Sequence, residues 1–403
     1  MQATPDWFKN AIVYSLDVRG FKDGNHDGRG DLKGLLDVFD YLVQLGVTCI
    51  WLSPICASQG RDDGYDIIDY YEIDAALGDF DDFQKLVERA KANDVKLLLD
   101  LVINHTSVDH PWFRRAVEQP GSIYYDYYIW QKEKPENTQR AIPLYEALER
   151  LPLANERQYL NFLRNHDELD LERLTEEERQ LVFAHFAPEP SMIIYDRGIR
   201  RRLPPMVGDN VQRVKLSMSL VLSLPGTPVI RYGEEIGMGD DLNLPERRSV
   251  RTAMQWSGVQ NAGFSDVAPQ AMQYPLIRKG PFSYRYVNVV DEAAIAASLL
   301  NEVKKMIAIR GTENHFFHEG FFAVRKTDNE AVLAFGYALD KRELLIVHNF
   351  METTANAELA LSTDGEIDIS VLLGSPLVST ANKQLKVMLP GYSYCWLLLT
   401  RDN

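Results

Sequence analysis

The first hundred residues alternate between the patterns of buried strands and amphipathic helices. Three short, nearly continuous apolar runs, 11–18, 47–55 and 95–103, predict strands of a parallel sheet, because such strands are covered on both faces. Between them, apolar residues recur at intervals of three and four in 31–45 and 79–93, which is the spacing of a helix. The alternating order predicts an α/β fold with a parallel sheet.

The middle of the chain is less regular. Residues 109–131 are rich in aromatic side chains, and the short polar stretch 132–140 leads directly into an expected helix at 141–151. Beyond it, the apolar patterns predict strands at 158–163 and 227–232, and helices at 213–222 and 291–310. Between 163 and 213 we expect a long, irregular helical region.

After about residue 314 the pattern changes to strand-like runs separated by Gly, Asp, Asn and Thr turns. This change predicts an all-β terminal domain, most simply a sandwich. We therefore expect two domains, 1–313 and 314–403. The expected strands of the second domain are 321–324, 331–338, 343–349, 357–361 and 392–400.

Composition narrows the class of protein. The chain has 403 residues, of which 45% are hydrophobic and 25% charged, so it can bury a large core. Its net charge of −15 repels phosphate backbones and anionic lipids, which argues against nucleic-acid or membrane partners. Residues 1–9 lack the pattern of a secretion signal, and the sparse cysteines, Cys49, Cys56 and Cys395, show no metal-binding spacing. We expect free, buried thiols in a reducing cytoplasm.

Oxygen-bearing side chains alternate in the loop after the first strand (DGNHDGRGD), as in the early part of an EF-hand loop. Gly34 stands where the EF-hand has a bidentate Glu. The pattern predicts a structural Ca²⁺ or Mg²⁺ site, and the alternative is that these side chains only cap turns. The predicted ligands are Asp23, Asn25, Asp27, the carbonyl oxygen of Arg29, and Asp31.

Two buried strands end in polar sets that contain Asn, His and Asp. These sets are 100–105 (DLVINH) and 165–168 (NHDE). Polar residues at the C-terminal ends of barrel strands lie at the active face, although either His alone is more often a structural group. The pair Tyr65 and Asp66 suits a sugar, because the ring can cover an apolar face and the carboxylate can accept hydroxyl hydrogen bonds. The alternative for Tyr65 is a turn residue in the core.

At these motifs the chain resembles the α-amylase superfamily, glycoside hydrolase family 13. The segments 47–55, 64–70, 100–105, 162–168 and 226–240 match in the family's order. The segments 198–210, 248–257 and 261–265 narrow the resemblance to the trehalose synthase (maltose glucosyltransferase) and α-glucosidase branch. The resemblance implies a TIM-type (β/α) barrel that acts on α-glucosides such as maltose and trehalose, by retaining glucosyl transfer or hydrolysis.

The resemblance also implies roles for individual residues. Asp167 would be the transition-state-stabilising aspartate, and the metal loop would fall on the five donors named above. His105 and His166 would donate or accept hydrogen bonds with the sugar hydroxyls, and Tyr65 would stack on the sugar ring. Asp66 would bind the outer hydroxyls, with Arg251 as its ion partner. Asp100 and Asn104 would support these side chains from below.

Two segments of the family are missing from the sequence. The family carries its nucleophile in a Gly-Phe-Arg-x-Asp strand and its acid/base Glu at the next strand end, and both should lie between 100–105 and 162–168. No Gly-Phe pair of this chain is followed by Arg-x-Asp. Only 56 residues separate His105 from Phe162, whereas three β/α units with a barrel insertion need about 150. We expect a barrel without strands 4–6, with a junction near 132–140 and a remnant of the insertion at 106–131.

This loss leaves three hypotheses. Retaining glycosidases need two carboxyl groups about 5 Å apart, and Asp167 replaces neither of them. The chain is then a deleted form of an enzyme on small α-glucosides, inactive as written. Alternatively it is a non-catalytic sugar-binding or scaffold protein. Thirdly, a second copy or another polypeptide completes the barrel, which leaves a homo-oligomer open.

Overall fold

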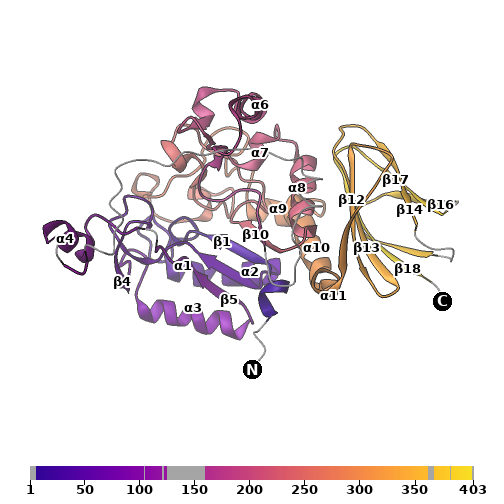
Figure 1. Ribbon diagram of the computed structural model, residues 1–403. Helices are drawn as coiled ribbons and strands as arrows, with labels where there is room; N and C mark the ends of the chain where they lie inside the picture. Colours follow the sequence, from indigo (N-terminus) through magenta and orange to yellow (C-terminus); the bar gives the residue numbers. More distant parts are fainter. Residues whose placement is uncertain are drawn as a thin grey trace.

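The computed structural model describes residues 6–103, 105–119, 122–124, 159–361, 367–381 and 383–401. Five parallel strands form one sheet in the order β5-β2-β1-β10-β6 (Figure 1). All five expected strands are present, although each is shorter than its apolar run. They are β1 (Val13–Leu16), β2 (Cys49–Leu52), β5 (Lys96–Leu99), β6 (Leu160–Asn161) and β10 (Thr227–Arg231).

Helices follow the strands, as the alternation predicted, but two of them are broken. The helix expected at 31–45 divides at Val38 into α1 (Leu32–Asp37) and α2 (Phe39–Leu45). The single helix expected at 291–310 is wrong, because Ser298 caps a new helix and leaves Ile295 outside both. The helices are α9 (Val289–Ala294), α10 (Leu299–Thr312), α3 (Phe80–Ala92) and α8 (Val211–Ser223).

Apolar side chains at the two edge strands of the sheet, β5 and β6, are exposed. In the central strands β2 and β1, by contrast, Ile50 and Leu16 are buried. Within the described part of the chain no strand pairs with the outer edge of β5 or of β6. The exposed side chains are Leu98, Leu99 (50%), Leu101 (69%) and Ile103 (81%) at β5, and Leu160 (51%) and Phe162 (49%) at β6.

Several short elements were not predicted individually, although two of the helices, α6 and α7, lie in the region expected to be irregular and helical. A hairpin follows β2, and a small sheet in the order β7-β9-β8 follows β6. The expected helix 141–151, the junction 132–140 and Asn104 lie outside the described residues. The additional elements are β3 (Cys56–Ser58), β4 (Ile67–Ile73), α4 (Pro111–Glu118), β7 (Leu169–Asp170), α6 (Glu176–Phe186), β8 (Ile193–Ile194), β9 (Gly198–Ile199), α7 (Leu203–Met206) and α11 (Asn314–Glu319).

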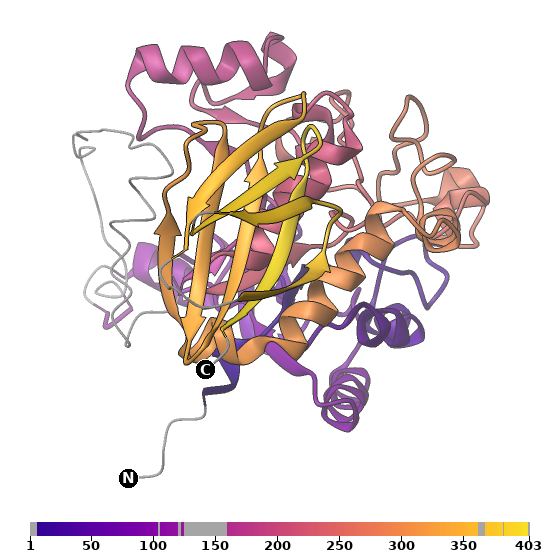
Figure 2. The ribbon, with the colours of Figure 1, turned by 90° about the vertical axis from the view of Figure 1, so that its right-hand side faces the viewer.

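The C-terminal residues form two antiparallel sheets, ordered β11-β12-β13-β18-β15 and β14-β17-β16 (Figures 1 and 2). Alternating side chains such as Val347, Leu397 and Leu385 make the core between them. The strands β15, β16 and β17 were missed because exposed side chains interrupt their apolar pattern. The strands are β11 (Phe321–Arg325), β12 (Val332–Leu339), β13 (Arg342–Asn349), β14 (Ala355–Ala360), β15 (Ile367–Leu373), β16 (Leu377–Ala381), β17 (Gln384–Leu389) and β18 (Tyr394–Arg401).

The β domain packs against α8 through a buried polar contact. Ser219 of α8 accepts a hydrogen bond from Trp396 Nε1 (2.9 Å) and lies 3.1 Å from His348 Nε2. Burial lowers the pKa of His348 to about 3, so its imidazole is neutral. Two of the free cysteines, Cys49 and Cys395, are buried, and Cys56 is half-buried rather than buried as expected. Among the described residues, every helix is too short or too polar to cross a membrane.

Candidate functional site

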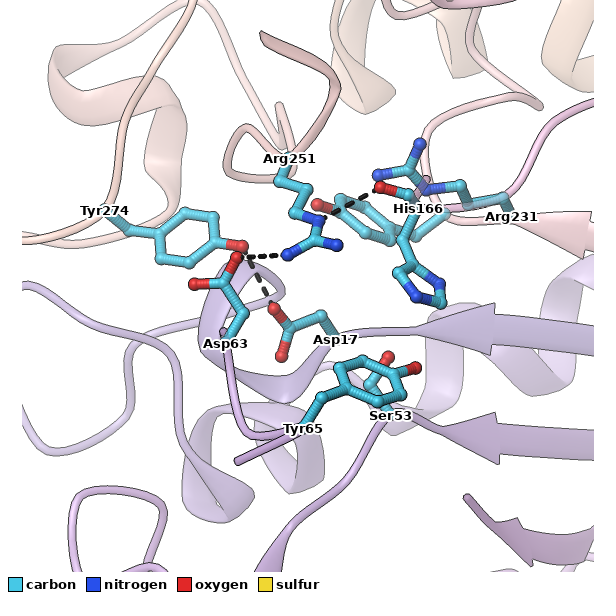
Figure 3. Close-up of a pocket in the computed structure, with 9 residues that line it drawn as sticks. Asp17, Ser53, Asp63, Tyr65, His166, Arg231, Arg251 and Tyr274 are labelled. Atoms are coloured by element: carbon cyan, nitrogen blue, oxygen red, sulfur yellow. Dashed lines mark hydrogen bonds and ion pairs between the residues drawn. The ribbon is translucent and has the colours of Figure 1, made fainter. Parts of the chain in front are cut away.

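Polar side chains from the segments that follow β1, β2, β6 and β10 meet at the C-terminal ends of these strands (Figure 3). Because parallel strands end at one edge, residues far apart in sequence become neighbours there. A cavity of about 10 Å³, room for about one water, lies between them. Its lining comprises Asp17, Ser53, Asp63, Tyr65, His166, Arg231, Tyr232, Arg251 and Tyr274.

Asp167 is surrounded by cationic and imidazole groups. Its carboxylate lies 2.9 Å from Arg251 Nη2, 3.4 Å from Arg247 Nε and 3.4 Å from His166 Nε2. Burial by itself raises the pKa of Asp167, but the three neighbours together hold this pKa below its ordinary value. Asp167 is therefore ionised at neutral pH, as a group that stabilises a developing positive charge must be.

Arg251 fixes the position of Asp167. Arg251 also contacts Asp63 (2.6 Å) and the carbonyl oxygen of His166 (3.0 Å), both drawn in Figure 3, and lies 3.5 Å from Asp62. The two carboxylates outweigh burial and raise the pKa of Arg251, so the guanidinium stays charged. The expected pairing of Arg251 with Asp66 was wrong, because the carboxylate of Asp66 accepts backbone N–H groups of its own loop instead.

The predicted aromatic platform is part of the same cluster. The Tyr65 ring stacks on the His166 ring with centroids 5.1 Å apart and 16° between the planes, and its hydroxyl donates to Asp100 (2.8 Å). His105 Nε2 lies 3.1 Å from the carbonyl oxygen of Tyr65. Burial lowers the pKa of His166 more than Asp167 raises it, so His166 is a neutral hydrogen-bonding group at pH 7. The structure thus brings together Tyr65, Asp100, His105, His166, Asp167 and Arg251, and leaves Asp66 on the adjoining loop.

Sequence reasoning missed several members of the site. Asp17 directly follows β1, so its position at a strand end was a usable signal. Arg247 lies in a short 3-10 helix, Glu246–Val250, and no sequence pattern indicated its role. In the structure it holds Glu168 with two hydrogen bonds, of 2.7 and 3.2 Å. That Arg247 contact outweighs the effect of burial and lowers the pKa of Glu168.

Two further carboxyl groups, near the end of β10, already accept hydrogen bonds from other parts of the protein. Glu235 accepts hydrogen bonds from the hydroxyls of Tyr14 (2.7 Å) and Tyr41 (2.6 Å). Glu234 accepts from the backbone N–H of Arg231, and burial raises its pKa to about 7. Both carboxyl groups are buried, so they cannot reach a substrate at this face.

The acidic loop closes on its own backbone. Asp23 accepts hydrogen bonds from the N–H groups of His26, Asp27 and Gly28, and Asp31 accepts from those of Gly24, Asn25 and Gly34. Within the part of the chain that the structure describes, no three His, Cys, Asp or Glu side chains lie together so as to hold a metal ion. The carboxylates are thus arranged as turn caps, and the Ca²⁺ or Mg²⁺ site stays a prediction.

The sequence of this chain is similar to a known protein family and to several characterised proteins. The family described as "Alpha amylase, catalytic domain" matches residues 16–173 and 199–320. A trehalose synthase of Thermus thermophilus is 31% identical over 501 residues, which span 89% of this chain and 52% of that protein. A trehalose synthase/amylase of Mycobacterium tuberculosis is 29% identical over 553 residues, or 99% of this chain and 91% of that protein. The chain therefore spans about half of the Thermus relative.

Solved structures agree on the fold. The trehalose-6-phosphate hydrolase of Bacillus licheniformis superposes with a TM-score of 0.71 at 20% identity, covering 98% of this chain and 100% of that one. The α-amylase of H. orenii gives a TM-score of 0.68 at 24% identity, with coverage of 98% and 100%. These neighbours imply a TIM barrel followed by a C-terminal β domain. The matched family, the relatives and the cluster around Asp167 agree, and the chain belongs to the α-amylase family, glycoside hydrolase family 13.

Proposed function

We propose that this chain is an internally deleted member of the α-glucoside-transforming branch of its family, and that it binds sugar without turning it over. This proposal rests on one observation: the sequence has no Gly-Phe-Arg-x-Asp segment, and only 56 residues separate His105 from Phe162. Without that block the chain has neither a nucleophile for the anomeric carbon nor an acid for the leaving oxygen.

The length of the alignment supports a deletion. The match to the Mycobacterium protein runs over 553 residues, which exceeds the 403 residues of this chain by 150. That excess is about the length of the three β/α units and insertion that the sequence lacks. The exposed apolar side chains at β5 and β6 give independent support, because strands of a closed barrel bury them.

Sugar binding is supported by what remains. Asp167 is ionised, His166 is neutral, and Tyr65 presents an aromatic ring beside both. Such a mixture of an aromatic face with carboxylate and imidazole acceptors and donors suits the apolar and hydroxylated faces of a pyranose. The substrates in the names of the relatives, trehalose above all, make small α-glucosides the ligands to test. Cytoplasmic location and a structural Ca²⁺ or Mg²⁺ remain predictions.

The test has a catalytic and a binding arm. Purified protein incubated with maltose should release neither trehalose nor glucose, and turnover that Asp167→Asn abolishes would refute inactivity. Glucose and maltose should bind in calorimetric titrations, and Tyr65→Ala should weaken that binding. Tyr71→Ala is the matched control, because Tyr71 lies on β4 with 80% of its surface exposed.

Sequencing the gene across the codons for 132–140 tests whether the junction is real. If neither sugar binds, the chain is a scaffold.

A further inference from the structure

A buried arginine stands at the end of β10, beside the candidate sugar site. Arg231 is the last residue of β10 and only 3% of its surface is exposed, and Figure 3 shows its side chain reaching toward the backbone of His166. Both terminal nitrogens of its guanidinium donate to carbonyl oxygens, Nη1 to that of Asn165 (2.7 Å) and Nη2 to that of Val250 (2.6 Å). Burial lowers the pKa of Arg231 to about 9, so the group is still charged at neutral pH. Because a buried charge is costly unless it is hydrogen-bonded, these contacts hold both carbonyl groups in place.

The two carbonyl groups belong to the segments that carry the central ion pair of the site. Asn165 comes two residues before Asp167, and Val250 directly precedes Arg251. Since the side chains of Asp167 and Arg251 meet at 2.9 Å, a single guanidinium joins the backbones on both sides of that contact. Both segments lie outside the strands of the parallel sheet, so the hydrogen bonds of the sheet do not fix their relative position.

Two more buried arginines bond to the same backbone. Arg164 Nη2 donates to the carbonyl oxygen of Asp167 (3.1 Å), and Arg202 Nε donates to that of Val250 (3.2 Å). Only 4% and 2% of the surfaces of these two arginines are exposed. A guanidinium presents its N–H donors in a rigid planar fork, whereas a lysine ammonium is a compact point charge on a flexible stem. Arginines thus hold the backbone behind the site, and Arg231 spans its two segments.

We propose that Arg231 is a positioning residue of the sugar site, whose guanidinium fixes the segment that carries Asp167 against the segment that carries Arg251. Without the fork the two segments shift, and Asp167 loses its alignment with the sugar. His166 shifts with its segment, away from its stacking on Tyr65. The expected effect on sugar affinity rests on the proposed sugar binding, whereas the stacking of His166 can be measured without any sugar.

The experiment compares Arg231→Lys with a matched control, Arg310→Lys. Arg310 is also 3% exposed and also donates to two carbonyl oxygens, those of Leu222 and Gly226 (2.7 Å each), but it lies at the opposite end of β10. Both variants should lower the melting temperature, because each loses a buried fork. In calorimetric titrations with maltose, Arg231→Lys should weaken binding about 3- to 10-fold, and Arg310→Lys should leave the dissociation constant unchanged.

Nuclear magnetic resonance of the histidine ring protons gives a second readout that needs no ligand. The Tyr65 ring stacks on His166 with centroids 5.1 Å apart, so its ring current shifts the His166 signals. The signals of His166 are those that disappear in His166→Gln. Arg231→Lys should move them toward the positions of an unstacked histidine, and Arg310→Lys should leave them in place. A loss of stability alone would move them in neither folded variant.

The outcomes separate this inference from the proposed function. The positioning role is refuted if Arg231→Lys binds maltose as wild type does, if it leaves the His166 signals in place, or if Arg310→Lys produces the same changes. If wild-type protein binds no sugar, the proposed function fails, and His166 signals that move only in Arg231→Lys still support the positioning role.

A second pair of variants covers a failure to fold. Arg231→Met and Arg310→Met remove the buried charge together with the fork, which is often tolerated better than an unpaired charge. They should reproduce the contrast in maltose affinity and in the His166 signals. If both substitutions of Arg231 unfold the protein while both substitutions of Arg310 leave it folded, Arg231 maintains the fold rather than the site, and the inference is overturned.

Discussion

If the sheet is open beside β5, as the proposed deletion implies, Ile103→Ala should cost little stability. Ile103 follows β5 with 81% of its surface exposed, whereas Ile50 in the neighbouring strand β2 is fully buried. Full burial of an isoleucine side chain stabilises a protein by about 1.5–3 kcal/mol. Since only about a fifth of Ile103 is buried, its truncation should cost no more than about 0.5 kcal/mol. Ile50→Ala removes the same atoms from the core and should cost about 2–5 kcal/mol.

Urea denaturation followed by fluorescence measures both variants. Ile103→Ala should leave the midpoint of the barrel transition within error of wild type, and Ile50→Ala should lower it clearly without changing the slope. A cost of about 2 kcal/mol or more for Ile103→Ala would refute the open edge. If that cost grows with protein concentration, a second copy covers the edge, because association adds its binding energy to stability. A cost independent of concentration means that another segment of the same chain covers it.

Three further predictions concern charge, metal and the domain interface. Asp167→Asn should destabilise the protein by about 1 kcal/mol, discounted for the partial exposure of Asp167, in denaturation at pH 6. Since the pKa of Asp167 is lowered in the folded state, the stability difference between wild type and Asp167→Asn should persist above about pH 4 and vanish as the pH falls through the lowered pKa. A stability difference that grows in acid would contradict a lowered pKa for Asp167. Calcium at 100 times its dissociation constant should add about 2.7 kcal/mol in thermal denaturation, and Asp27→Asn should remove this gain; no shift in wild type would leave the acidic loop as turn caps. Ser219→Ala should cost about 2–3 kcal/mol by calorimetry, because the buried polar nitrogens of His348 and Trp396 lose their partner, and a loss below 0.5 kcal/mol would show that the contact is dispensable.

Much of the barrel was predictable from local pattern. The strands β1, β2 and β10 are continuous apolar runs because they are buried in the parallel sheet, and residue type records that burial directly. β5 has the same apolar pattern, although most of its side chains are exposed. The helix breaks at Val38 and Ile295 were not predicted, because apolar spacing continues across both and only the local capping contacts end the helices. Strands such as β16 were missed for a different reason, because exposed side chains interrupt their apolar pattern.

The sequence by itself determined the family motifs and the absence of a Gly-Phe-Arg-x-Asp segment, because both depend on which residues are present and at what spacing. It also indicated that His105, His166 and Asp167 share a site, since their motifs close strands and parallel strands end at one edge. The place of Tyr65 in that site was implied by the family resemblance. Only the tertiary structure decided which charges meet. Arg251 pairs with Asp63 and Asp167 rather than with Asp66, and Arg247 joins Asp167 to Tyr195. Such pairings span tens to hundreds of residues and depend on side-chain reach and loop conformation, so periodicity and composition carry no record of them.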